Sequence, residues 1–318
     1  MIVVVDSSRK RNNGQINIVL RNNSRKQITK ELPLQQEPFE KQIPPQHQAL
    51  KEIEEELESL VGMEEMKKII KQIYAWIYVN KKREEIGLKV GRQALHMMFK
   101  GNPGTGKTTV ARLIGKLFVK MNVLAKGHLI EGERADLVGE YIGHTAQKTR
   151  DLVKKAIGGI LFIDEAYSLG RGGEKDFGKE AIDTLVKHME DKQHEFILIL
   201  AGYSKEMEYF LTLNPGLHSR FPIVIEFPDY TVPQLMEIAS IMMREREYVF
   251  SKDAEQKLQN HLYFIKENWS PISFSNGRYI RNTIEKSIRT QAMRLLMNDV
   301  YDRAELLTIR SQDLQFDD

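Results

Sequence analysis

The sequence predicts an α/β fold in which a parallel sheet is sandwiched by helices, followed by a small α-helical domain. Short apolar runs alternate with helical segments, and strands that are separated by helices usually pair in parallel. Four of these runs read as buried strands, at residues 95–99, 160–163, 196–201 and 223–227. From Val232 onward only helical periodicity remains. The sheet is therefore expected in the first part of the chain and a helical domain in the last part.

The first 48 residues differ in pattern from the rest and predict a separate arm. Residues 1–34 alternate apolar and polar side chains, and Asn12-Asn13-Gly14 between two such runs is a hairpin signal. Residues 35–48 are rich in proline and glutamine and poor in apolar side chains, which is typical of a linker. The sequence thus predicts a short β-hairpin-like arm that a linker joins to the sheet domain.

Two helices are expected between this linker and the first strand. Apolar residues recur at intervals of three and four from residue 49 to about residue 86, which indicates helix. Val61-Gly62 interrupts the pattern and is expected to form the hinge between the two helices. We therefore expect an α/β domain over residues 49–228 and a helical domain over residues 229–318.

Composition excludes several kinds of chemistry. The chain has no cysteine, which removes disulfides, zinc ribbons, iron–sulfur clusters and thiol nucleophiles. Its 47 Lys and Arg residues nearly balance 44 Asp and Glu residues, and a net charge of +3 is too small to indicate a nucleic-acid or membrane surface. The apolar runs are far shorter than the roughly 18 residues that cross a bilayer. Basic residues follow the apolar start of the chain, the reverse of a secretory signal. We expect a cytoplasmic protein that does not enter a membrane.

A phosphate-binding loop is the strongest chemical signal in the sequence. The pattern is matched completely by Gly101-Asn102-Pro103-Gly104-Thr105-Gly106-Lys107-Thr108, which follows an expected strand and opens an expected helix at residues 109–120. Its glycines let backbone N–H groups turn toward phosphate oxygens, and the helix N-terminus adds its dipole. Lys107 is expected to reach the β and γ phosphates, and Thr108 to ligate Mg²⁺.

Two adjacent acids supply the partner element. The buried run at residues 160–163 ends in Asp164 and Glu165. Asp164 is expected to hold Mg²⁺, and Glu165 to orient and polarise the attacking water. An adjacent Asp-Glu pair suits hydrolysis by water, and the guanine-reading Asn-Lys-x-Asp pattern is absent from the sequence. ATP hydrolysis is therefore favoured over GTPase or small-molecule kinase activity.

These residues resemble those of the AAA+ ATPases, from about Leu50 to the C-terminus. Residues 101–112, 140–145 and 159–169 resemble the subfamily that contains red-type Rubisco activase. This full set, with the N-terminal arm and Ala201-Gly202-Tyr203, is most similar to sporulation proteins of spore-forming bacteria. The resemblance implies a P-loop AAA+ module with a helical lid. It also implies a ring, normally a homo-hexamer, with ATP and Mg²⁺ at each subunit boundary. A role in spore maturation in the mother cell follows from the same resemblance.

The resemblance gives roles to residues outside the two motifs. Val61 and Gly62 are expected to contact adenine between the α/β domain and the lid. Arg220, in Ser219-Arg220-Phe221, is placed like the arginine that reaches the ATP of a neighbouring subunit. Arg278 is expected to contact the same phosphate from the lid as the second sensor, and Arg281, one helical turn away, is the alternative.

The first sensor departs from the family pattern. Many members end the fourth strand with Asn or Thr, whereas here the strand runs into Gly202-Tyr203, and the Tyr203 hydroxyl is the candidate substitute. The catalytic residues expected from motif and resemblance are Lys107, Glu165, Arg220 and Arg278. The expected nucleotide-binding residues are Val61, Gly62, Gly101, Asn102, Pro103, Gly104, Thr105, Gly106, Lys107, Thr108, Thr109 and Arg281. The expected metal ligands are Thr108 and Asp164.

Tyr141-Ile142-Gly143 lies between the phosphate-binding loop and the acids, where AAA+ rings project a loop into the central channel. An aromatic side chain on a loop flanked by glycine can press against an extended polypeptide without reading its sequence. The resemblance therefore implies that Tyr141, Ile142 and Gly143 contact a protein client in the pore.

Three functions remain open at this level. The first is an ATP-driven ring that remodels an unidentified protein client, with the N-terminal arm as a candidate docking element. The second is a DNA-acting AAA+ ATPase of the clamp-loader or branch-migration type. Nucleic acid is disfavoured because the arginines of the C-terminal region, such as Arg289 and Arg294, are interspersed with acidic and apolar positions. The third is a scaffold in which nucleotide binding controls assembly.

Overall fold

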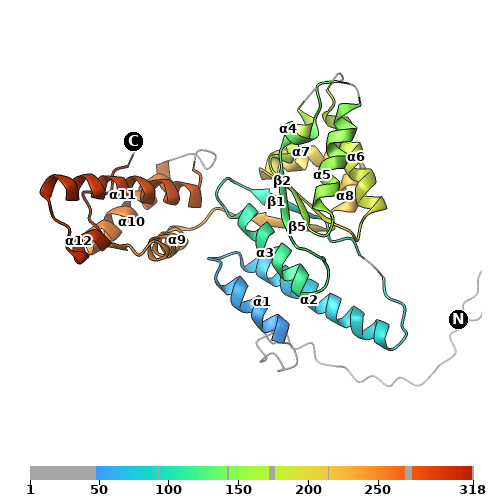
Figure 1. The fold of residues 1–318 in the computed structure, drawn as a ribbon, viewed down its shortest axis with the longest axis horizontal. Helices are drawn as coiled ribbons and strands as arrows, with labels where there is room; N and C mark the ends of the chain where they lie inside the picture. Colours follow the sequence, from blue (N-terminus) through green and yellow to red (C-terminus); the bar gives the residue numbers. More distant parts are fainter. Residues whose placement is uncertain are drawn as a thin grey trace, which may run out of the picture. The chain divides into compact units, whose positions relative to one another are not determined.

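The computed structural model describes residues 48–91, 93–141, 143–171, 176–213, 215–268 and 274–316. The arm expected at residues 1–34 and nearly all of the expected linker lie outside these ranges. Figure 1 shows the order of the elements along the chain.

A parallel five-stranded sheet forms the centre of the first part of the chain, as predicted. Its strands are β1 (Met97–Gly101), β2 (Leu129–Gly132), β3 (Ile160–Ile163), β4 (Ile197–Gly202) and β5 (Ile223–Phe227), in the spatial order β2-β3-β4-β1-β5. All four pairings are parallel, with Ile160 opposite Ile197 and Met97 opposite both Ile199 and Ile223. The predicted α/β fold is confirmed.

The strand bounds differ from the prediction in instructive places. β3 and β5 have the expected bounds, whereas β1 and β4 begin later than expected and end at Gly101 and Gly202. β2 was not expected at all. It is a four-residue edge strand in which Leu129 and Ile130 are partly buried and Glu131 is exposed, so it carries no apolar run that the sequence could reveal.

Helices cover both faces of the sheet (Figure 1). One layer contains α1 (Gln48–Glu58), α2 (Glu64–Glu85) and α3 (Lys107–Lys120); the other contains α4 (Arg134–Leu137), α5 (His144–Ala156), the 3₁₀ helix η2 (Ala166–Gly170), α6 (Gly178–Asp191), α7 (Ser204–Thr212) and α8 (Pro215–Arg220). Successive strand side chains point to opposite faces, so Met97 and Phe99 pack in the first layer and Met98 in the second. The core is thus divided by the sheet.

The break between α1 and α2 confirms the predicted hinge. Gly62 and Met63 both have left-handed backbone conformations, with φ of 67° and 62°. Glycine adopts this conformation readily, and a helix cannot continue through it. The chain therefore turns between Glu58 and Glu64, and Val61 in this turn is buried.

The C-terminal part is helical, as predicted, with one small addition. Its helices are α9 (Val232–Glu245), α10 (Lys252–Asn268), α11 (Gly277–Asn298) and α12 (Arg303–Leu307). A short parallel pair, β6 (Val249–Phe250) and β7 (Thr308–Ile309), joins the start of α10 to the end of the chain. Among the helices that the structure describes, none is both long and apolar enough to cross a membrane.

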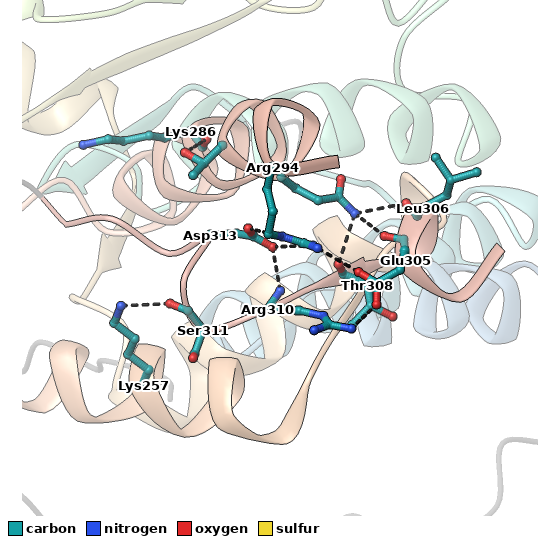
Figure 2. Close-up of polar contacts among 11 residues, drawn as sticks. Lys257, Lys286, Arg294, Glu305, Leu306, Thr308, Arg310, Ser311 and Asp313 are labelled. Carbon is teal, nitrogen blue, oxygen red and sulfur yellow. Dashed lines mark hydrogen bonds and ion pairs between the residues drawn. The ribbon is translucent and has the colours of Figure 1, made fainter. Parts of the chain in front are cut away.

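A buried polar network fixes the C-terminal segment to α11 (Figure 2). The Asp313 carboxylate, which is fully buried, accepts hydrogen bonds from Arg294 Nε at 2.8 Å and Nη2 at 3.0 Å. Arg294 Nη1 also donates to Glu305 at 2.7 Å. Gln291 Nε2 donates to the carbonyl oxygens of Glu305, Leu306 and Thr308. The buried Asp313 carboxylate is thus paired and hydrogen-bonded, and loss of Arg294 would leave its charge uncompensated.

His96 is a buried titratable group in the sheet core. Its side chain is 1% exposed, and its Nδ1 accepts a hydrogen bond from the Leu198 amide at 3.0 Å. The neutral ring must then carry its proton on Nε2, which faces the Met189 carbonyl at 3.5 Å. Burial lowers the pKa of His96 to about 4 from its usual 6.5.

We predict that this histidine destabilises the fold as the pH falls from 6.5 toward 4. The unfolded chain binds the proton first, so the free energy of unfolding attributable to His96 should drop by up to about 3 kcal/mol across this window and be constant above it. Urea denaturation at a series of pH values measures this effect. Asn at position 96 keeps an acceptor for the Leu198 amide, so His96→Asn should flatten the pH dependence. An equal slope in both proteins would contradict the prediction.

Candidate nucleotide site

A cavity of about 420 Å³ lies where three strands of the sheet end. β1 and β4 end at lining residues Gly101 and Gly202, and Asp164 follows β3 directly. Ligands of parallel α/β sheets bind at the carboxyl ends of the strands. The other walls come from Ser59, Leu60, Val61 and Met63 before α2, from Ile238, Ile241, Met242 and Glu245 on α9, and from Gly277, Arg278 and Arg281 on α11.

The phosphate-binding loop adopts a conformation that requires glycine. Gly104 and Gly106 have φ of 71° and 94°, and Gly106 is the N-cap of α3. A Cβ atom on Gly104 would lie 2.0 Å from the Ser275 carbonyl oxygen. The loop therefore approaches α11 too closely for any side chain at this position. Its backbone leads into the N-terminus of a 14-residue helix, which suits it to bind phosphate.

Lys107 provides positive charge beside the phosphate-binding loop. Its Nζ donates hydrogen bonds to the carbonyl oxygens of Gly101 at 2.8 Å and Asn102 at 2.7 Å. Burial lowers the pKa of Lys107, and the charge of Arg278 acts in the same direction, while Asp164 acts against it. The residues present fit a nucleoside triphosphate, because anionic phosphate would stabilise both cations.

The two predicted acids line the same cavity. Asp164 Oδ1 accepts a hydrogen bond from the Glu165 amide at 2.9 Å, and both side chains are exposed. Glu165 has a left-handed backbone conformation, with φ of 46° and ψ of 42°. Such a conformation costs on the order of 1–3 kcal/mol outside glycine, and the surrounding structure must hold it. Thr108 also lines the cavity, and one hydroxyl and one carboxylate beside phosphate oxygens form a ligand set typical of Mg²⁺.

A hydrogen-bond network that the sequence did not reveal joins the phosphate-binding loop to the C-terminal helical domain, residues 229–318, which we call the lid. Asn102 Nδ2 donates to both oxygens of Asp229, at 3.0 and 3.1 Å, and Asn276 Nδ2 donates to Asp229 Oδ1 at 2.7 Å. Tyr230 Oη donates to the Thr105 carbonyl at 3.1 Å, and the Tyr230 amide donates to Asn276 Oδ1 at 3.1 Å. Asp229 and Tyr230 come just after β5, at the edge of the sheet where the cavity lies, and this position was the one sign in the sequence that they belong to the site.

The lid side of the cavity combines apolar side chains with Glu245 and two arginines. Ile238, Ile241 and Met242 of α9 line it, although their periodicity in the sequence indicated only a helix that packs in a core. Arg278 and its alternative Arg281 both line the cavity. Both candidates for the second sensor are therefore on the surface that would face a nucleotide.

The remaining predicted nucleotide contacts fall into two groups. Lining residues from the prediction are Val61, Gly101, Pro103, Gly104, Gly106, Lys107, Thr108, Thr109 and Arg281, and Tyr203 also lines the cavity. Gly62, Asn102 and Thr105 are not among the lining residues. Gly62 packs against Gln234, where a Cβ would lie 2.5 Å from Nε2. Thr105 Oγ1 donates to the Asn102 carbonyl at 2.8 Å, so these two residues hold the loop in shape.

Arg220 and the tyrosine of the predicted pore segment lie outside this cavity. Arg220, on α8, pairs with Glu190 and donates from Nη1 to the Gly216 carbonyl at 2.8 Å. Tyr141 is 66% exposed, and its ring meets His144 edge-on at 5.4 Å. Gly143 has φ of 82°, and Ile142 lies outside the described residues. The roles of these residues stay predictions.

The fold and the cavity define a P-loop ATPase with a helical lid. Residues 97–229 match the family described as "ATPase family associated with various cellular activities (AAA)", and residues 231–318 match the family described as "AAA lid domain". The chain belongs to the AAA ATPase family.

The chain is similar to several known proteins. It is 71% identical over 306 residues to stage V sporulation protein K of Bacillus subtilis, which covers 96% of this chain and 94% of the relative. It is 43% identical over 260 residues to protein CfxQ of Xanthobacter flavus, covering 81% of each. It is 41% identical over 258 residues to the chloroplastic ribulose bisphosphate carboxylase/oxygenase activase of Cyanidioschyzon merolae, covering 80% of this chain and 87% of the relative.

We predict that Arg278, rather than Arg281, contacts the terminal phosphate. Arg278 is close enough to Lys107 to influence its pKa. Because a lost charge-assisted hydrogen bond costs about 1.5–3 kcal/mol, Arg278→Ala should weaken ATP binding about tenfold or more and ADP binding little. Titration with fluorescent ATP and ADP analogues measures both affinities, and Arg281→Ala is the matched comparison. Equal weakening of ATP and ADP by Arg278→Ala would contradict this assignment.

Proposed function

We propose that this AAA ATPase is a homo-hexameric ring motor that hydrolyses ATP with Mg²⁺ and remodels a protein client through its central pore. The observation that carries the hydrolysis is that Lys107, Asp164 and Glu165 share one cavity with the lid arginines. The high identity to stage V sporulation protein K supports a role in spore maturation. The mother-cell cytoplasm is the corresponding location.

The residues of the cavity suggest how each would act. Mg²⁺, held by Thr108 and Asp164, would neutralise charge on the phosphates. Lys107 would bind the β and γ phosphates, and Glu165 would orient water for attack on the γ phosphate. Leu60, Val61 and the apolar side of α9 would bury the base. Arg278 would contact the terminal phosphate, so the position of α11 would depend on whether that phosphate is present.

Two features support a ring that handles protein. Arg220 lies outside the cavity of its own subunit, as expected for an arginine that acts on a neighbour's ATP. Tyr141 exposes 66% of its surface, so much of its ring is available to a partner. An exposed aromatic side chain on the segment before α5 suits contact with an extended polypeptide.

Glu165→Gln should retain bound ATP, stop its hydrolysis and hold the ring on its client, because the amide cannot polarise the attacking water. Steady-state ATPase assays and nucleotide binding test the first part. Affinity capture from sporulating cells in the presence of ATP tests the second. Unchanged turnover would reject the role of Glu165.

Tyr141→Ala in the Glu165→Gln background supplies the matched control for the capture. Proteins retained through the pore should be lost with Tyr141→Ala and kept with Tyr209→Ala, because Tyr209 is equally exposed, at 65%, but lies on α7. Retention of the same proteins by both double variants would contradict the pore role. Binding of duplex DNA at low salt would instead favour the DNA-acting alternative.

Arg220→Ala subunits should regain activity when they are mixed, before assembly, with Glu165→Gln subunits. Each variant alone should be inactive, since an arginine aimed at the γ phosphate contributes about 10³–10⁵ in rate. In a mixed ring, an intact Glu165 can meet an intact Arg220 from the neighbour at about a quarter of the boundaries. ATPase activity of the mixture measures this complementation. Absence of activity in verified mixed rings would contradict action between subunits.

A further inference from the structure

Arg134 links two segments that the proposed function uses separately. It is the first residue of α4, seven residues before Tyr141. Its Nη1 donates a hydrogen bond to the Ser168 carbonyl at 2.7 Å, and its Nη2 pairs with Asp176 Oδ1 at 2.5 Å. Ser168 belongs to η2, which begins directly after Glu165. One guanidinium therefore connects the segment before Tyr141 with the turn that carries the second acid.

That turn is held in an unfavourable backbone conformation. Glu165 is left-handed, and its carbonyl accepts a hydrogen bond from the Ser168 amide at 2.8 Å. The Ser168 carbonyl in turn accepts from Arg134. A strained residue persists only where its surroundings over-determine it. Arg134 fastens the far end of the turn and so restricts where the Glu165 carboxylate can lie.

Asp176 and Gly178 form the site in which the Arg134 guanidinium lies. Asp176 Oδ1 also accepts from the Gly178 amide at 3.0 Å, which ties the arginine to the start of α6. A Cβ on Gly178 would lie 2.9 Å from Arg134 Nη1 and 2.1 Å from the Leu169 carbonyl. Glycine at this position leaves room for the guanidinium against η2.

The other end of the same segment is fastened to α5. Lys148 Nζ donates to the carbonyls of Ala135 and Val138, at 3.2 and 3.1 Å. Thr145 Oγ1 accepts from the Gly139 amide at 3.0 Å, and Thr149 Oγ1 donates to the Leu137 carbonyl at 3.3 Å. These bonds tie α4 and the residues up to Gly139 to α5, so the segment that carries Tyr141 is anchored on both sides.

A second cavity shows that these parts face each other. Its volume is about 580 Å³, and residues 133–135 and 138–140 line it together with Asp164, Glu165 and Ser168. The acids thus form a wall shared by the nucleotide cavity and the space beside α4.

We propose that Arg134 is a positioning residue for ATP hydrolysis, which holds the Glu165 turn and couples it to the segment that carries Tyr141. This inference rests on the proposed role of Glu165. Arg134 is not among the residues that line the nucleotide cavity, and it acts through its hydrogen bond to the η2 backbone.

The experiment is a comparison of kcat and KM for ATP in the full chain. A misplacement of about 1 Å can lower a rate about 10²-fold, so Arg134→Gln should lower kcat about ten- to hundredfold and leave KM within about threefold. Arg134→Lys should recover part of kcat, because an ammonium can keep one of the two bonds. Asp176→Asn should lower kcat less, and its effect should not add to that of Arg134→Gln. Arg150→Gln is the matched control, since Arg150 is exposed on α5 and donates to the Ala146 carbonyl.

Two results would overturn the proposal. They are a normal kcat in Arg134→Gln, whether or not KM is raised, or the same loss of kcat in Arg150→Gln. If Arg134→Gln fails to fold by circular dichroism, Arg134→Lys and Asp176→Asn decide, and normal kcat in both would overturn it. Glu165→Gln distinguishes failure of the proposed function from failure of the positioning role. Unchanged turnover there removes the proposed function itself, whereas loss there with a normal Arg134→Gln removes only the positioning role.

Discussion

The Asp229 carboxylate is the group on which the geometry of the nucleotide site depends. It accepts hydrogen bonds from Asn102 of the phosphate-binding loop and from Asn276 at the start of α11. Asn276 is fully buried, and its own amide oxygen accepts from the Tyr230 backbone. A buried amide that lost its acceptor would cost about 1–3 kcal/mol. One carboxylate therefore fixes the loop and the lid to each other.

The close approach of loop and lid follows from this connection. The Gly277 amide donates to the Gly104 carbonyl at 3.0 Å, and Gly104 has no space for a side chain. The start of α11 consequently lies on the loop, and Arg278 and Arg281 reach the cavity. Arg294 and Asp313 connect the other end of α11 to the C-terminal segment (Figure 2). A phosphate contact at the start of α11 would therefore act on α11 and the C-terminal segment together.

The sequence predicted those parts of the site that depend on local chemistry. The loop was located because its motif begins where a buried strand, β1, ends. Asp164 and Glu165 were located because they directly follow β3, which has the expected bounds. β2 was missed because a half-exposed edge strand has no apolar run. Helical periodicity predicts that α9 has an apolar face, but the same pattern serves a core or a base-binding wall. Ile238 and Met242 could therefore be assigned only in three dimensions.

Polar contacts over long sequence separations were equally inaccessible. Asn276 reaches Asp229 across 47 positions, and Arg134 reaches Ser168 across 34. A single asparagine or arginine in a sequence gives no sign of its partner, because most such side chains lie in solvent. The fold places β3 and β5 beside other strands of one sheet, and only this arrangement brings the residues after them within reach of the lid and of α4.

Lys107 shows how the loop can exchange partners without losing its shape. Its Nζ donates to two neutral carbonyls, those of Gly101 and Asn102. A phosphate oxygen is a stronger acceptor because it is charged, so phosphate at this end of the cavity would draw the ammonium away from them. The Asn102 carbonyl would remain satisfied, since it also accepts from Thr105 Oγ1 at 2.8 Å. The side chain of Asn102 meanwhile stays bonded to Asp229. The connection between loop and lid therefore does not depend on which acceptor Lys107 uses, and the lid can respond to the terminal phosphate through its own arginines.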